Sequence, residues 1–297
     1  MLYEYAVEPN CLSEWSNFRY LMENCGVSRG RLISEFPSKW LKMTYLHGNK
    51  FTFNQKQKME LALRRIKKNG LCKSSRPYDG NLDWLENALA QHKKIPFQAI
   101  ISSESNDENQ VLDVSEITET DPLWGDQRTA IVPRNAQAMA AAVSTLLSVA
   151  KHIILIDPHF GPENGRHRRP FQAFLHEAAQ SRSIGMPVVE VYTQVKSTEE
   201  FFREECRRRL TGLIPAGLTV RFVRWTVRPG GQQLHNRYIL TDLGGVSFQH
   251  GLDDGQVGET DDVVLLDRES YEQRWSEYVG DKPAFDLPAK PFEIIGK

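Results

Sequence analysis

A histidine and an arginine stand two residues apart in the last third of the chain, as His235 and Arg237, and Asp242 follows five residues later. The apolar residues between them predict a β-strand. Residues two apart in a strand point to the same face, so we expect His235 and Arg237 to reach into one pocket. An imidazole that attacks phosphorus and a guanidinium that holds phosphate oxygens are what phosphodiester chemistry through a phosphohistidine needs.

Helices and strands that alternate from Pro133 onward must position these residues. The sequence predicts a helix over 136–150 capped by Asn135, a strand at 153–156 and a helix opened by Pro170. A strand at 188–192, a helix to Leu210 and a strand at 218–225 then lead to the strand of His235. Such alternation predicts an α/β layered domain with a mostly parallel central sheet.

This motif and this order of elements resemble the phospholipase D-like superfamily, whose signature is His, any residue, Lys, four residues and Asp. His235, Arg237 and Asp242 match that spacing, and the resemblance covers roughly residues 130–280. Within the superfamily the chain looks closest to the C-terminal phospholipase D-like domain of MIT-domain proteins and to bacterial relatives with a His-x-Arg core. The run Gly251-Leu252-Asp253 and the predicted strand at 259–266 fit that pattern.

The resemblance implies a role for each motif residue. His235 would attack phosphorus, Arg237 would hold the nonbridging oxygens, Asp242 would orient an imidazole, and a second imidazole would protonate the leaving oxygen; no metal or other cofactor is implied. Two features depart from the family: arginine replaces the usual lysine, and Gln249-His250 replaces Gly-Ser. Arginine binds phosphate at least as well as lysine does. His250 falls near His235 in the sheet and is therefore a fourth candidate catalytic residue.

A second copy of the chain is implied by the motif count, because family enzymes combine two motifs and this sequence has one. We expect a homodimer with a composite site at the twofold axis. The MIT-associated domains are regarded as membrane-binding and dimerising modules. The alternative is therefore a noncatalytic module that dimerises and binds nucleic acid, a partner protein or an anionic membrane.

Other basic residues are candidates for substrate binding. His159 follows a predicted strand, at the edge where α/β sheets place ligands, although a structural histidine in a turn explains it equally well. The run Arg166, His167, Arg168 and Arg169 lies in a polar loop before a predicted helix, whose free amides also attract anions. We expect a phosphate clamp there; the alternative is a solvated loop.

Residues 1–95 differ from the rest in charge. They carry 16 lysines and arginines against 9 acidic residues, a balance of +7, whereas residues 96–297 carry 21 against 29, or −8. Helical spacing of apolar residues predicts a mainly helical region. One of its helices carries Arg64, Arg65, Lys67 and Lys68. A basic helix can lie against a phosphate backbone or an acidic partner, and otherwise it is a solvated helix face.

The sequence predicts three segments: a basic helical region at 1–95, a strand followed by an acidic linker at 96–129, and a phospholipase D-like domain at 130–297. No apolar run approaches the roughly 18 residues of a membrane span, and the four cysteines show no zinc or disulfide spacing. We therefore expect a soluble cytoplasmic protein. The resemblance implies a metal-independent nuclease that acts as a bacterial phage-defence effector, with an ATPase or another defence-operon protein as a partner.

Overall fold

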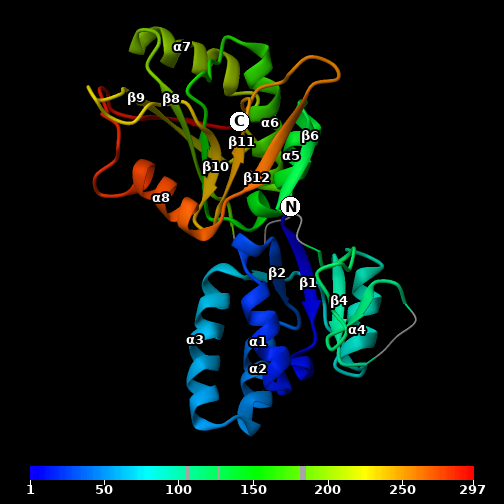
Figure 1. Ribbon diagram of the computed structural model, residues 1–297. Coiled ribbons are helices and arrows are strands. Elements are labelled where there is room, and N and C mark those ends of the chain that lie inside the picture. Colours follow the sequence, from blue (N-terminus) through cyan, green and yellow to red (C-terminus); the bar gives the residue numbers. More distant parts are fainter. Residues whose placement is uncertain (105–107, 126–127, 181–184) are drawn as a thin grey trace. The chain divides into compact units, whose positions relative to one another are not determined.

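The computed structural model of the chain describes residues 1–104, 108–125, 128–180 and 185–297 (Figure 1). The chain divides into two compact units, an N-terminal unit at Leu2–Gln127 and a C-terminal unit at Arg128–Lys297. Each unit is built around its own sheet. Both sheets are combined with helices, so the α/β class expected from the sequence is confirmed.

Five parallel strands form the sheet of the N-terminal unit, in the order β3-β2-β1-β4-β5. The strands are β1 (Tyr3–Val7), β2 (Arg31–Glu35), β3 (Leu71–Lys73), β4 (Ala99–Ser102) and β5 (Val111–Asp113). The helices are α1 (Trp15–Asn24), α2 (Trp40–His47), α3 (Phe53–Asn69) and α4 (Trp84–His92), with short 3-10 turns at Pro9–Ser13, Val27–Arg29 and Gly48–Lys50.

Helices cover both faces of this sheet, as the alternation of side chains along β1 shows (Figure 1). Tyr5 and Val7 pack in a core with Trp40 and other residues of α1, α2 and α3. Ala6, between them, packs in a second core with Trp84 of α4. Most of the regular structure in residues 1–95 is helical, as expected, but the region also contributes three strands, which the sequence analysis missed, to a three-layer α/β unit.

β2 lies in the region at 1–95 for which the spacing of apolar residues predicted helices. Pro37 separates β2 from α2, because the residue before a proline disfavours the helical conformation. The basic helix is confirmed as α3. It begins with a capping box in which the Thr52 hydroxyl accepts from the Gln55 amide and the Gln55 side chain accepts from the Thr52 amide.

Up to residue 125, the described part of the expected acidic linker belongs to the N-terminal unit, whereas residues 128 and 129 belong to the C-terminal unit. The strand expected at 96–102 is confirmed as β4, and β5 pairs with it. Trp124 is fully buried with its ring edge against Tyr5. The Arg31 guanidinium lies 4.4 Å from the centre of the Trp124 ring, and its Nε donates to the Trp124 carbonyl at 2.9 Å. Residues 105–107 and 126–127 of the expected linker lie outside the described residues.

Eight strands form the sheet of the C-terminal unit, in the order β13-β9-β8-β7-β10-β11-β12-β6. The strands are β6 (Thr129–Pro133), β7 (His152–Ile156), β8 (Val188–Gln194), β9 (Thr219–Trp225), β10 (Arg237–Thr241), β11 (Gly245–Phe248), β12 (Thr260–Leu265) and β13 (Phe292–Ile295). The helices are α5 (Ala136–Val149), α6 (Gly165–Ala179), α7 (Glu199–Leu210) and α8 (Arg268–Val279).

The order of helices and strands expected before the His235 motif is confirmed, but this sheet is mixed rather than mostly parallel. Only β7 with β8 and β8 with β9 pair in parallel. β10 is antiparallel to both of its neighbours, β7 and β11. Residues 226–236, which link β9 to β10, contain no helix that could return the chain to the opposite edge, so β10 runs back from the edge where β9 ended.

Helices also cover both faces of the C-terminal sheet (Figure 1). On one face, Phe174 of α6 packs against Phe248 of β11, and Phe202 of α7 packs against Phe222 of β9. On the other face, Tyr278 of α8 packs with residues of β7, β8 and β10. The α5 cap expected at Asn135 is confirmed, since its side chain accepts from the Ala138 amide at 2.9 Å.

Helix α6 begins five residues before the proline that was expected to open it. Pro170 has no amide proton, so it leaves the carbonyl of Arg166, four residues earlier, without its helical partner. The Asp254 amide donates to that carbonyl at 3.0 Å. Pro170 therefore leaves a carbonyl through which the loop between β11 and β12 is hydrogen-bonded to the first turn of α6.

The burial of Trp124 generates the first prediction. Trp124→Ala should lower the free energy of unfolding of the N-terminal unit by about 3–5 kcal/mol, because it removes a large buried ring. Chemical denaturation followed by tryptophan fluorescence and circular dichroism would measure the loss. Leu61→Ala, at a side chain that is 67% exposed, is the control and should change little. Equal stability of the two variants would mean that residues 114–125 are not part of this core.

Candidate functional site

The start of β10 lies beside the ends of β7 and β11, because β10 runs antiparallel to both. Tyr238 pairs with Ile156, and Arg237 pairs with Phe248. Because β8 runs parallel to β7, it also ends at this edge. Five basic residues are thereby brought to one edge of the C-terminal sheet, which we call the site edge: His159 after β7, Lys196 after β8, His235 and Arg237 at the start of β10, and His250 after β11.

Asp242 lies at the opposite end of β10 from the site edge. One oxygen of its carboxylate accepts from the backbone amides of Lys151 and His152, at 2.8 and 3.1 Å, where β7 begins. The expectation that Asp242 orients a catalytic imidazole is therefore wrong. Four residues of extended strand lie between Arg237 and Asp242, and the Asp242 side chain connects the start of β7 to the end of β10.

His235 precedes β10, and only Arg237 of the expected pair belongs to the strand. The His235 side chain is exposed and makes no hydrogen bond with any described residue. The expectation that strand geometry points both side chains in one direction is thus met by Arg237 alone, and His235 lies in the approach to the strand.

Arg237 is a half-buried cation whose charge no described residue neutralises. Its Nε is buried and has no hydrogen-bond partner, and its guanidinium forms no ion pair within the described parts of the chain. A buried polar group without a partner is unfavourable. An anion bound at the site edge would supply the missing acceptor.

His159 lies against a lysine that the sequence did not single out. The Lys196 ammonium lies 2.6 Å from Nδ1 of the imidazole, which accepts from it. Partial burial lowers the pKa of His159 below its ordinary value, and the charges of Lys196 and Arg237 lower it further, while Asp157 opposes them. His159 is therefore neutral at pH 7, in an environment that carries two positive charges.

The loop that carries Lys196 is held by Arg224, a buried residue of β9. Its guanidinium donates to the carbonyl oxygen of Ser197 at 2.6 Å and to that of Thr198 at 3.3 Å. These bonds fix the backbone directly after Lys196. No sequence motif indicates the contact between Arg224 and the loop of Lys196, because the loop and β9 are distant in sequence.

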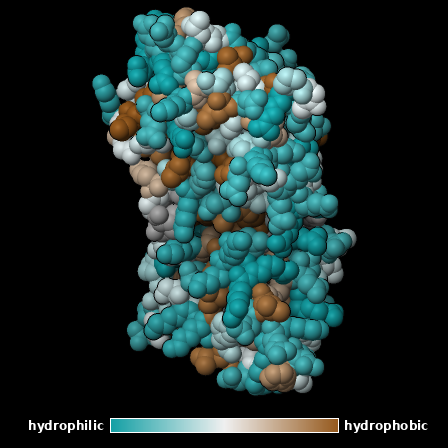
Figure 2. Space-filling view, turned by 90° about the vertical axis from the view of Figure 1, so that its left-hand side faces the viewer, coloured by the Kyte–Doolittle hydropathy of each residue, from teal (hydrophilic) through white to brown (hydrophobic). Residues whose placement is uncertain are grey.

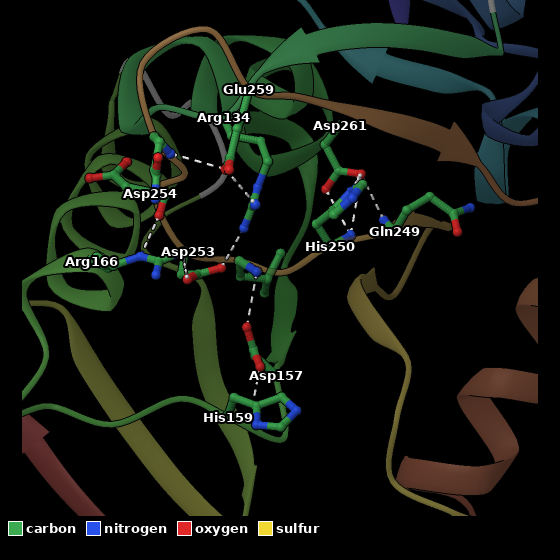
Figure 3. A network of polar contacts seen from close by, with 12 residues as sticks. Arg134, Asp157, His159, Arg166, Gln249, His250, Asp253, Asp254, Glu259 and Asp261 are labelled. Atoms are coloured by element: carbon green, nitrogen blue, oxygen red, sulfur yellow. Dashed lines mark hydrogen bonds and ion pairs between the residues drawn. The ribbon is translucent and has the colours of Figure 1, made fainter.

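Asp261 performs the role expected of Asp242, on a different histidine (Figure 3). Its fully buried carboxylate lies 3.2 Å from Nδ1 of His250 and also accepts from the backbone amides of Gln249 and His250. The His250 side chain is 61% exposed. A neutral imidazole that donates from Nδ1 leaves Nε2 as a free acceptor. His250 is thus an oriented imidazole with its reactive nitrogen available, as a general acid or base requires.

A buried aspartate connects the loops that carry the two ordered imidazoles (Figure 3). Asp157 directly follows β7, and one of its oxygens accepts from the His159 amide at 2.8 Å. The other oxygen accepts from the Leu252 amide at 2.9 Å, in the loop that follows His250. Asp157 therefore holds the loops of His159 and His250 together but offers no free oxygen of its own to a cation.

The three arginines of the expected phosphate clamp make contacts within the protein, and Figure 3 shows those of Arg166. Arg166 pairs with Asp253 at 2.9 Å and Arg169 with Asp254 at 2.5 Å. Arg168 donates to two backbone carbonyls of the preceding loop. Carboxylates of the β11–β12 loop thus pair with Arg166 and Arg169, while both side chains stay more than half exposed, and the phosphate clamp stays a prediction.

His167, also expected to bind substrate, is buried. Its Nδ1 accepts from the Gly161 amide at 3.3 Å, and its ring packs against Phe160. It lies in the first turn of α6 rather than in a loop before the helix. His167 therefore stabilises the turn after β7 and is not available to a ligand.

A pocket of about 760 Å³ lies between α6, the start of α5 and the β11–β12 loop. Basic and acidic side chains both line it, among them Arg169, His176, Asp254 and Glu259. None of the five residues of the site edge lines it. The pocket and the site edge are therefore distinct features of the C-terminal unit.

The described residues include no group of three or more histidine, cysteine, aspartate or glutamate side chains that could hold a metal ion. In the same parts of the chain, every helix is too short or too polar to cross a membrane. No protein-family model matches the chain, and no curated protein is significantly similar to it. The resemblance to the phospholipase D-like superfamily therefore stays a prediction from the motif.

The contact between Lys196 and His159 generates the second prediction. Lys196→Met should raise the pKa of His159 toward its ordinary value, because it removes the nearest positive charge. The titration of the His159 Cε1 proton by nuclear magnetic resonance would measure the change. Lys151→Met, at the opposite end of β7, is the control and should leave the titration unchanged. An unaltered His159 curve in Lys196→Met would contradict the contact.

Proposed function

We propose that the C-terminal unit is a phospholipase D-like domain and that its site edge binds and cleaves a phosphodiester without a metal, as a nuclease does. One observation carries the proposal: a neutral His159 beside Lys196, an unpaired Arg237 and an Asp261-held His250 converge on the edge that also carries His235. Two uncompensated cations attract a phosphate, and the imidazoles supply nucleophilic and acid–base chemistry.

The proposed reaction follows from these residue types. His235 attacks phosphorus and forms a phosphorus–nitrogen bond, while the bond to the leaving oxygen breaks and that oxygen takes a proton from a second imidazole. Water then attacks the phosphohistidine, which releases the phosphate and restores His235. Arg237 and Lys196 stabilise the charge that builds on the nonbridging oxygens.

Helix α3 supports a nucleic acid as the substrate. Lys67 and Lys68 are exposed in its last turn. Arg64 pairs with Glu60, and Arg65 donates to the Met22 carbonyl. Of the four expected basic residues, the two lysines are therefore more available to a ligand than the two arginines. Hydrophilic residues cover most of the face shown in Figure 2, although α3 also exposes Phe53 and Leu61. This surface suits a phosphate backbone better than the apolar interior of a membrane.

The proposed biological role is that of a bacterial phage-defence effector. It includes a cytoplasmic location, a homodimer and an ATPase or another defence-operon protein as partner. This part of the proposal rests on the resemblance of the motif around His235 alone.

A noncatalytic binding module is the second candidate function. The observation that favours it is the state of His235, which lies outside β10 and has no described residue to orient it. On this reading Arg237 and Lys196 hold a phosphate group of nucleic acid, a partner protein or an anionic membrane, and no bond is broken.

The two candidates differ in what variants of the motif should do. If the site is catalytic, His235→Ala should abolish the cleavage of labelled DNA, RNA or a generic phosphodiester in excess chelator while binding persists, because the imidazole forms the covalent bond but contributes little to holding the phosphate. Arg237→Ala should lose cleavage and binding together. Arg237→Lys should keep appreciable activity if charge alone matters, and lose more if two-pronged contact positions the phosphate.

Arg268→Ala, at an exposed arginine of α8 that pairs with Glu272, is the matched control and should behave as wild type. A wild-type protein that binds these substrates but cleaves none of them would favour the binding module.

The role of α3 can be tested by charge reversal. Lys67→Glu with Lys68→Glu should weaken the binding of DNA or RNA and reduce the dependence of affinity on salt, because fewer counterions are released. Adding Arg64→Glu and Arg65→Glu should reduce both further. Lys93→Glu with Lys94→Glu is a control with the same charge change at two exposed lysines after α4. Fluorescence anisotropy at several salt concentrations would measure both quantities, and equal effects of the two pairs would remove α3 as the dock.

A further inference from the structure

The register of β10 and β11 relates the exposed histidines of the site edge. Arg237 pairs with Phe248, and Tyr238 pairs with Ser247. Both strands end at the Arg237–Phe248 pair, and the next residues that this register would place opposite one another on the same face are His235 and His250. Opposite residues of an antiparallel pair have Cβ atoms about 4.5–5.5 Å apart and point to the same face. An extended approach to β10 would place His235 on the face that carries Arg237.

The chain bends directly after β11, and the bend is held against β12. The amides of Gln249 and His250 both bond to the buried Asp261 carboxylate near the start of β12. These bonds keep residues 249 and 250 beside β12. Asp261 therefore holds His250 at the site edge, next to the start of β10.

We infer that His250, oriented by Asp261, is the second imidazole of the phosphate site formed by His235 and Arg237 of the same chain. The inference rests on the proposed function. The chain then supplies in one protomer what family enzymes draw from two motifs. Each protomer holds a complete site, whether or not the protein dimerises.

The proton balance of the two steps fits this assignment. In the first step, Nε2 of a protonated His250 gives its proton to the leaving oxygen, while Nδ1 continues to donate to Asp261. The neutral imidazole that results has a free lone pair on Nε2. In the second step, that lone pair takes a proton from the attacking water, which returns His250 to its starting state. His250 is the catalytic residue in this scheme, and Asp261 is a positioning residue.

Activity measurements test whether the site is complete in one chain. His250→Ala should lower kcat by about 10²-fold or more, as expected for the loss of a general acid, and free imidazole should restore part of the activity. Asp261→Asn should lower kcat with little change in KM and should alter the pH profile. His176→Ala, at an exposed histidine of α6, is the control.

A complementation experiment with two impaired variants decides whether the site lies within one chain. His235→Ala and His250→Ala variants, co-expressed with different tags and isolated together, should remain inactive, because neither chain then holds both imidazoles. Activity regained in the mixed species would overturn the inference and assign the second imidazole to a partner copy. A fully active His250→Ala would overturn it while leaving the proposed hydrolysis intact.

A binding measurement keeps the inference testable if no substrate is cleaved. In ¹⁵N-histidine spectra, neutral His250 should carry its proton on Nδ1, and Asp261→Asn should abolish this preference. Titration with inorganic phosphate or tungstate should shift the signals of His235 and His250 together in wild type and shift neither in Arg237→Ala. A joint shift without hydrolysis would uphold the shared site and reject the proposed function. A shift of His235 alone would overturn the inference.

Discussion

The antiparallel position of β10 between β7 and β11 is the constraint on which the site edge depends. It places the first residue of β10 beside the last residues of its two neighbours. Had β10 run parallel to β7, Arg237 would lie at the opposite edge from His159. The cause is the link from β9 to β10, which contains no helix and therefore cannot carry the chain across the sheet.

The distribution of acidic residues decides which cations remain available to a ligand. Ion pairs join Arg166 to Asp253 and Arg169 to Asp254. The Asp261 carboxylate contacts the imidazole of His250. The Asp157 carboxylate accepts hydrogen bonds from two backbone amides. Because buried charges are unfavourable without partners, the absence of any described carboxylate at Arg237 stands out against this pattern of compensation.

Local signals predicted much of the fold and failed where tertiary context decided. The caps at Asn135 and Thr198 lie before helices that were expected, and α3 follows its own capping box. β1 and β2 were missed because they are short strands in a sheet that is covered on both faces, so no alternation of polar and apolar residues marks them. The charge balance of residues 1–95 indicated a basic helix but could not reveal the sheet on which it packs.

The sequence by itself determined the α/β class, the order of elements before the His235 motif, and His235, Arg237 and His250 as the residues with chemistry to offer. Those features depend on residue type and on spacing within one element. Only the tertiary structure decided that Lys196 contacts His159 and that Asp261 rather than Asp242 orients an imidazole. It also decided that carboxylates of the β11–β12 loop pair with Arg166 and Arg169. Each of these contacts joins residues from different elements. Their meeting depends on strand direction and register, which local spacing does not encode.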